Sequence, residues 1–125
     1  MYPILTPFPP QKFQWILVES FKCQLSDGYV LTIPAGYIFD GHSVPRPFWA
    51  IFPPFGRDIV SALVHDYLYE YGASMGYNRA FVDYQHLYFS LKPEYNISFI
   101  RSYSAWVVIR LFGFVFWHFG QKRVV

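Results

Sequence analysis

The sequence contains little cysteine and little charge. Cys23 is the only cysteine in 125 residues, so the chain has no disulfide framework and no thiolate zinc cluster. Charged residues make up 14% of the chain, well below the roughly 25% of an average globular protein. The Lys and Arg residues are dispersed and do not form the basic stripe that binding to a phosphate backbone requires. We therefore expect a reducing compartment or a virion, and no nucleic-acid partner.

Apolar and aromatic residues are abundant instead. Hydrophobic residues make up 54% of the chain and aromatic residues 23%, which excludes a disordered tail. A length of 125 residues predicts a single domain spanning residues 1–125. This composition indicates that part of the surface is covered by a partner, a lipid surface or another copy of the chain. The alternative is a monomer with an aromatic-rich core.

One segment raises the question of a membrane span. Residues 97–119 are apolar, but Arg101 and Arg110 lie inside them. An arginine near the centre of a spanning helix costs about 3 kcal/mol on insertion, and the charge-free residues 111–119 are too short to span alone. A packed or interfacial helix is therefore expected. No signal peptide is expected either, because the first residues lack a positively charged segment followed by an apolar run.

The first part of the chain is expected to be extended. Residues 1–12 are rich in proline and predict an extended arm that packs on its surroundings without forming an element. Residues 13–33 are rich in β-forming residues and contain Asp27-Gly28, which favours a two-residue turn. They predict a β-hairpin, with a third strand as an option. Residues 34–56 combine prolines with aromatics and predict a long ordered loop with a functional role.

Residues 57–120 are expected to be helical. Apolar residues recur at helical spacing up to Gly72, where the first helix should stop. Asn78 can cap a second helix, and Pro93 can open a third and longest one. The short connection between the first two helices favours an antiparallel pair. The expected fold class is therefore α+β, mostly α, with a hairpin or small antiparallel sheet followed by three helices.

A small set of polar residues stands out in this apolar chain. It consists of Asp40, Gly41 and Ser43 in the loop, His65, Asp66 and Tyr69 on the first predicted helix, and Arg79 and Asp83 on the second. His65 and Asp66 are neighbours on a helix, so their side chains leave about 100° apart and serve different partners. In an antiparallel pair of helices His65 can face Asp83 and form a His-Asp dyad. The carboxylate would fix the imidazole tautomer and leave the other ring nitrogen to take a proton from water or a hydroxyl.

Asp66 points elsewhere, and the loop at Asp40 and Gly41 is the candidate to meet it. Glycine lets a backbone carbonyl approach closely. Two carboxylates and a carbonyl oxygen form a hard-oxygen site that suits Ca²⁺ or Mg²⁺. A second option places His65, Asp66 and Asp40 on one transition metal.

Each of these residues also has a structural explanation. A His beside an Asp on a helix is commonly a satisfied core pair, and Asp40-Gly41 alone commonly forms a turn. Asp83 can pair with Arg79 one helical turn earlier, and Tyr69 can be a core tyrosine with a hydrogen-bonded hydroxyl. Burying several ionisable residues is costly unless they satisfy one another. Together they predict a buried polar site, of which catalysis is one explanation.

The motifs resemble those of a family of short phage and prophage proteins called domain of unknown function 1353. The resemblance is carried by residues 30–36, Phe39-Asp-Gly-His-Ser-Val-Pro45, Leu63-Val-His-Asp-Tyr-Leu-Tyr69, Arg79 with Asp83, and Val108-Ile-Arg-Leu-Phe-Gly113. It implies a phage-encoded protein in the virion or the host cytoplasm. Its partners would be other phage proteins or further copies of itself. The resemblance implies no activity.

The order of the polar motifs is also similar to that of small secreted bacterial and fungal phospholipases of the A-two class. This resemblance implies that His65 is the general base and that Asp83 orients it. It implies a Ca²⁺ site formed by Asp66, Asp40 and the Gly41 carbonyl. The chain departs from those phospholipases in lacking their disulfides and in carrying His42 where a small residue or cysteine is usual.

Two functions from different classes follow. The first is a Ca²⁺-dependent ester hydrolase with a phospholipase-like site, acting on a lipid ester. The second is a non-catalytic phage structural or accessory protein, such as a virion or tail component, that docks through its proline-rich arm and aromatic surface. The polar set favours catalysis, whereas the aromatic excess favours assembly.

Overall fold

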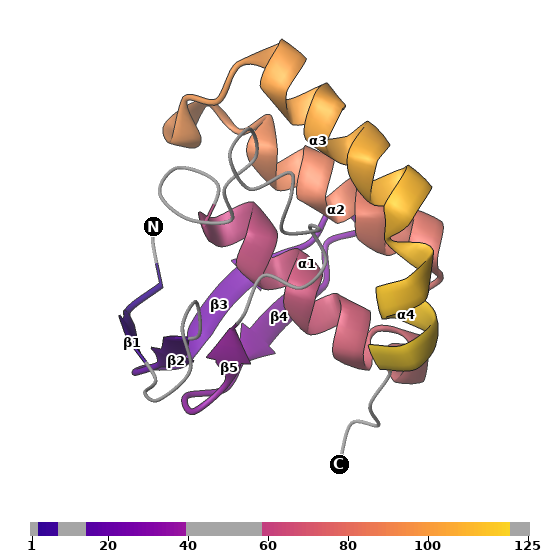
Figure 1. The fold of residues 1–125 in the computed structure, drawn as a ribbon. Helices are drawn as coiled ribbons and strands as arrows, with labels where there is room; N and C mark the ends of the chain where they lie inside the picture. Colours follow the sequence, from indigo (N-terminus) through magenta and orange to yellow (C-terminus); the bar gives the residue numbers. More distant parts are fainter. Residues whose placement is uncertain (1–2, 8–14, 40–58, 121–125) are drawn as a thin grey trace.

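The computed structural model describes residues 3–7, 15–39 and 59–120. Helix α1 runs between the strands and the remaining helices (Figure 1). The strands are β1 (Leu5–Pro7), β2 (Trp15–Leu17), β3 (Phe21–Gln24), β4 (Val30–Ile33) and β5 (Ile38–Phe39). The helices are α1 (Ile59–Tyr71), α2 (Arg79–Ser90), α3 (Phe99–Phe112) and α4 (Phe114–Gly120), with 3₁₀ helices η3 (Ala73–Met75) and η4 (Pro93–Tyr95). Small antiparallel sheets followed by helices confirm the predicted α+β, mostly helical class.

The hairpin predicted around Asp27 is present as the antiparallel pair β3 and β4. Its turn is one residue longer than expected. The Leu25 N–H donates to the Tyr29 carbonyl at 2.9 Å, and the Gly28 N–H donates to the Leu25 carbonyl at 3.0 Å. Gly28 has a φ of 91°, a conformation that glycine adopts without steric cost. A three-residue loop that ends in such a glycine is a common hairpin connection.

A second sheet contains β2, which is the optional third strand of residues 13–33, and two strands that the sequence did not predict, β1 and β5. β2 lies in its middle and pairs antiparallel with β1 on one side and with β5 on the other. β1 lies inside residues 1–12, so the expectation that this arm forms no element was wrong. The strand tolerates Pro7 because it lies at the edge of the sheet, where not every N–H is needed for pairing. β5 likewise shows that the first part of the predicted loop at residues 34–56 belongs to a sheet.

Helices α1 and α2 follow the sequence closely. α1 ends before Gly72, whose N–H donates to the Leu68 carbonyl at 2.7 Å. α2 begins after Asn78, which has extended backbone dihedrals and accepts a hydrogen bond from the Phe81 N–H at 2.8 Å. The predicted stop and the predicted cap are both confirmed.

The Asn78 cap supports a stability prediction. The Asn78→Ala variant loses the side-chain acceptor for a backbone N–H at the start of α2, so its free energy of unfolding should fall by about 1 kcal/mol. Urea unfolding followed by circular dichroism measures the change. Asn78→Ser retains a capping oxygen and should stay close to the wild type. Equal losses in the two variants would contradict a capping role.

The predicted third helix is divided. Pro93 opens only the 3₁₀ helix η4, because Asn96 then adopts a left-handed φ of 52°. Ser98 caps the start of α3 by accepting from the Arg101 N–H at 3.2 Å. At Gly113 the chain passes from α3 to α4, and a Cβ atom there would overlap the Tyr69 hydroxyl. No helix in the described ranges is both long and apolar enough to cross a bilayer.

α1 is the central helix of the fold. Every residue from Val60 to Tyr69 is buried, and the helix contacts α2, α4 and β5. Its apolar residues join the buried residues of the strands and of α2 in one hydrophobic core. His65 and Asp66 lie in this buried stretch, so the fold places both in the protein interior.

Candidate functional site

Asp83 on α2 is the centre of a buried polar cluster. Its side chain is fully buried, and both of its carboxylate oxygens have partners. His65 Nε2 lies 2.9 Å from Asp83 Oδ1, and the Tyr69 hydroxyl donates to the same oxygen at 2.5 Å. The structure therefore brings together the two predicted dyad residues, one from each of two adjacent helices.

The second carboxylate oxygen of Asp83 binds two arginines. Arg110 Nη1 of α3 donates to Oδ2 at 2.7 Å, and Arg79 Nη1 lies 3.3 Å from the same atom. Arg79 Nη2 also donates to the Arg110 carbonyl at 3.0 Å, near the end of α3. Asp83, His65, Tyr69, Arg79 and Arg110 are called the Asp83 cluster below. The cluster connects α1, α2 and α3.

The electrostatics of the cluster keep Asp83 ionised. Burial alone would raise the pKa of its carboxyl group, but hydrogen bonds from His65, Tyr69 and Arg110 outweigh burial and lower it. Burial and the adjacent Asp83 charge raise the pKa of Tyr69. Tyr69 therefore stays protonated and acts as a hydrogen-bond donor. A carboxylate with this many donors is a fixed negative charge in the core.

His65 has one ring nitrogen bound and one available. The carboxylate of Asp83 can only accept, so Nε2 carries the proton that it donates, and in a neutral ring the opposite nitrogen Nδ1 is then an acceptor. Nδ1 is buried and has no hydrogen-bond partner within the described part of the chain. The ring packs at a centroid distance of 4.2 Å from Tyr69. Because an unsatisfied buried acceptor costs stability, it indicates a place for water or a ligand.

His86 on α2 is a second buried histidine beside this one. Its ring lies 5.4 Å from the His65 ring, centroid to centroid, and its Nδ1 has no hydrogen-bond partner among the residues described. Burial, more than the neighbouring His65, lowers the pKa of His86 to about 3. His86 is therefore neutral at physiological pH.

Asp66 is separated from the Asp83 cluster, as the angle between neighbouring helix residues predicts. The Tyr37 hydroxyl donates to Asp66 Oδ2 at 3.2 Å. Tyr37 comes just before β5 and three residues before Asp40 in the sequence. The start of the predicted loop therefore reaches Asp66.

The rest of the predicted Ca²⁺ site cannot be placed. Asp40, Gly41 and Ser43 lie outside the described residues. Among the residues that the structure covers, no group of three or more His, Cys, Asp or Glu could hold a metal ion. The buried Asp66 carboxylate is chemically suited to Ca²⁺ as one oxygen ligand. The Ca²⁺ site stays a prediction.

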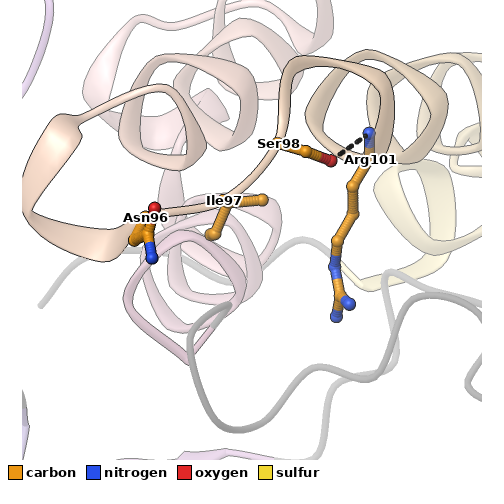
Figure 2. A pocket seen from close by; sticks show the side chains of 4 residues that line it. All are labelled: Asn96, Ile97, Ser98 and Arg101. Atoms are coloured by element: carbon orange, nitrogen blue, oxygen red, sulfur yellow. Dashed lines mark hydrogen bonds between the residues drawn. The ribbon is translucent and has the colours of Figure 1, made fainter.

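Two surface pockets are lined by residues outside the Asp83 cluster. Figure 2 shows one of about 410 Å³, lined by Asn96, Ile97, Ser98 and Arg101 at the start of α3. Arg101 precedes Arg110 by nine residues, about 13 Å along a helix, so this pocket is separate from the Asp83 cluster. The other pocket, of about 220 Å³, is lined by Gly36, Tyr37, Ile38, Glu70 and Tyr71. It therefore lies beside the contact between Tyr37 and Asp66.

Sequence reasoning missed Arg110, His86 and Tyr37. A usable signal existed for Arg110, because an arginine inside an otherwise apolar helix needs a buried anion or an exposed position. At helical spacing His86 occupies an ordinary amphipathic position, and nothing in the sequence indicates that Tyr37 meets Asp66.

The fold and the cluster define a small α+β protein with a buried, aspartate-centred ionic site. The model of a protein family matches residues 15–109, and the chain belongs to this family, described as protein of unknown function (DUF1353). The match contains four residues of the Asp83 cluster and ends one residue before Arg110. Searches of curated proteins and of solved structures found no match.

Proposed function

We propose that this protein hydrolyses carboxylic esters, with His65 as the general base. The observation that carries the proposal is the state of the His65 ring. Nε2 contacts an ionised carboxylate at 2.9 Å, while the opposite nitrogen Nδ1 is buried without a hydrogen-bond partner in the described residues. A general base needs this combination of an orienting carboxylate and an available nitrogen.

In the proposed mechanism His65 Nδ1 removes a proton from a water molecule as the water oxygen attacks the ester carbonyl. The imidazolium then returns this proton to the leaving alkoxide as the acyl C–O bond breaks, which gives a carboxylic acid and an alcohol. The imidazolium that forms is stabilised by Asp83, which accepts from Nε2–H and does not change its own protonation. Tyr69 and Arg79 hold Asp83 ionised and in place. Asp66 would be one ligand of Ca²⁺, with Asp40 and the Gly41 carbonyl as its predicted companions. Bound Ca²⁺ would polarise the ester carbonyl.

The substrate class and setting belong to the same proposal. The order of motifs resembling A-two phospholipases supports a lipid ester as the substrate. The resemblance to phage and prophage proteins supports a phage-encoded protein that acts in the virion or the host cytoplasm.

One observation favours a second candidate, a non-catalytic phage accessory protein. Arg79 and Arg110 both bind Asp83 Oδ2, so the carboxylate is neutralised without any charge on His65. A buried ion cluster with a purely structural role, holding three helices together, requires that its carboxylate be neutralised in this way. In that case His65 is one of several donors to Asp83 and takes no part in chemistry.

An ester hydrolysis assay with two matched variants separates the candidates. The wild type is assayed on short-chain and phospholipid esters, with Ca²⁺ and with a chelator. His65→Gln should lower kcat/KM roughly 100-fold, the size of effect expected for loss of a general base. His86→Gln removes an equally buried imidazole that does not bind Asp83 and should retain most of the activity.

The unfolding free energy of both variants is measured alongside the activity. Activity that falls only in proportion to the loss of folded protein would assign His65 a structural role. A wild type without ester hydrolysis under either metal condition would rule out the enzyme and leave the accessory protein.

A further inference from the structure

Gly113, at the junction of α3 and α4, lies against the hydroxyl end of Tyr69. Its φ of −72° and ψ of −15° are helical values that any residue adopts, so the backbone does not require glycine there. The available space does require it. A Cβ atom at this position would overlap the Tyr69 hydroxyl oxygen and lie 3.2 Å from Cζ, the ring carbon that carries the oxygen. Because carbon atoms pack at about 3.5–4.0 Å, any side chain at position 113 would displace Tyr69.

Tyr69 has little room to yield to such a clash. Its side chain is buried, and its ring packs on the His65 ring at a centroid distance of 4.2 Å. The Trp117 ring of α4 contacts it edge-on at a centroid distance of 5.4 Å. α4 itself lies beside α1, the helix that carries Tyr69 (Figure 1). Tyr69 can therefore move only by changing its contacts with His65, with Asp83 or with α4.

The position of the Tyr69 hydroxyl matters because it shares an acceptor with His65. The hydroxyl donates to Asp83 Oδ1 at 2.5 Å, and His65 Nε2 contacts the same oxygen at 2.9 Å. Tyr69 thus touches both the ring of the proposed base and the carboxylate that orients it. A displaced Tyr69 would loosen the His65–Asp83 contact from two sides.

We propose that Gly113 is a positioning residue of the His65–Asp83 pair. Because Gly113 has no side chain, the Tyr69 hydroxyl fits between the α3–α4 junction and Asp83, and Tyr69 then holds the His65 ring in place. The inference gives a role to the end of the segment Val108-Ile-Arg-Leu-Phe-Gly113, which the ester hydrolase proposal does not use. Its consequence for catalysis rests on the proposed function, whereas the placement of Tyr69 does not.

The steric part is tested with Gly113→Ala, Tyr69→Phe and the double variant in urea unfolding. Gly113→Ala should raise the unfolding equilibrium constant at least about tenfold, because the added methyl group overfills a closed space. Part of this effect does not involve Tyr69, since the new Cβ would also lie 2.5 Å from the Ile109 carbonyl oxygen. Tyr69→Phe removes the overlapped hydroxyl and is the matched background, in which Gly113→Ala should have a several-fold smaller effect. Equal effects in both backgrounds, or failure to fold in both, would overturn the proposal.

The hydrogen bond to Asp83 is followed by NMR on protein whose tyrosines carry ¹³C at Cζ. The Tyr69 signal is assigned by its absence in Tyr69→Phe. In Gly113→Ala this signal should move toward those of the exposed Tyr84 and Tyr103, because the displaced hydroxyl no longer donates to a buried carboxylate. A general loss of stability would not move the signal of the folded protein. An unmoved Tyr69 signal in folded Gly113→Ala would therefore contradict the proposal.

Ester hydrolysis tests the consequence for catalysis. Gly113→Ala should lower kcat at least about tenfold and leave KM nearly unchanged, because Tyr69 positions the base and does not contact the substrate. The double variant should lose no more than the weaker of the two single variants, since both substitutions remove the same hydrogen bond. Losses that multiply would show that Gly113 acts by another route. A wild type without ester hydrolysis would end the hydrolase proposal, and the unfolding and NMR results would still decide whether Gly113 places Tyr69.

Discussion

Replacing Asp83 with asparagine should lower the free energy of unfolding by about 3 kcal/mol. The substitution keeps the shape of the side chain but removes the charge that Arg79 and Arg110 contact at 3.3 and 2.7 Å. Breaking a buried ion pair by removing one partner costs about 3–5 kcal/mol, because the remaining charge is left uncompensated. We expect the lower end of this range, since the two arginine side chains are 20% and 34% exposed and water screens part of their uncompensated charge.

Urea unfolding at neutral pH measures this change. Glu94→Gln removes an exposed carboxylate outside the Asp83 cluster and should change the free energy of unfolding by less than about 0.5 kcal/mol. If Asp83→Asn and Glu94→Gln were equally mild, the cluster would not be a determinant of stability. Asp83→Asn should also lose ester hydrolysis, because a neutral amide cannot stabilise the His65 imidazolium.

The protein should lose about 3 kcal/mol of stability between pH 7 and pH 4 through His86 alone. Burial lowers the pKa of His86 from 6.5 to about 3 in the folded state. Below pH 6.5 the unfolded chain therefore binds a proton that the folded chain does not, which favours unfolding. Each pH unit in this window costs about 1.4 kcal/mol. The lowered pKa of Asp83 acts in the same direction, but only as the pH falls toward that lowered value.

His86→Gln isolates the contribution of this histidine. Its unfolding free energy should depend much less on pH between 7 and 4 than that of the wild type, whatever its stability at pH 7. Chemical unfolding of both proteins at a series of pH values provides the comparison. Parallel pH profiles would show that His86 is not the group responsible.

The sequence predicted the parts of the fold that rest on local signals. Gly72 and Asn78 mark the ends of α1 and α2 through backbone rules that act within one helical turn. The contact between His65 and Asp83 was predictable because a short connection fixes two adjacent helices antiparallel. Their proximity then follows from position along the helices.

The features that were missed depend on distant parts of the chain. β5 forms because β2, more than twenty residues earlier, offers a free edge, and no local pattern marks that pairing. The break after η4 depends on Asn96 adopting a left-handed conformation. The residue type Asn permits this conformation but does not require it. Arg110 meets Asp83 only because α3 folds back over α2. Helical periodicity does not determine which neighbour a helix packs against.

Arg79 has a consequence for the local unfolding of α3. Its guanidinium donates to the carbonyls of Ile109 and Arg110, so it caps the C-terminal end of the helix from a neighbouring helix. The opposite end has the local Ser98 cap but no contact of this kind from the cluster, and it begins with the exposed Phe99 and Ile100. α3 should therefore fray from its first turn while its last turn stays closed. Amide hydrogen exchange would then slow progressively along α3 toward Arg110, with its most protected turn where the helix meets the cluster.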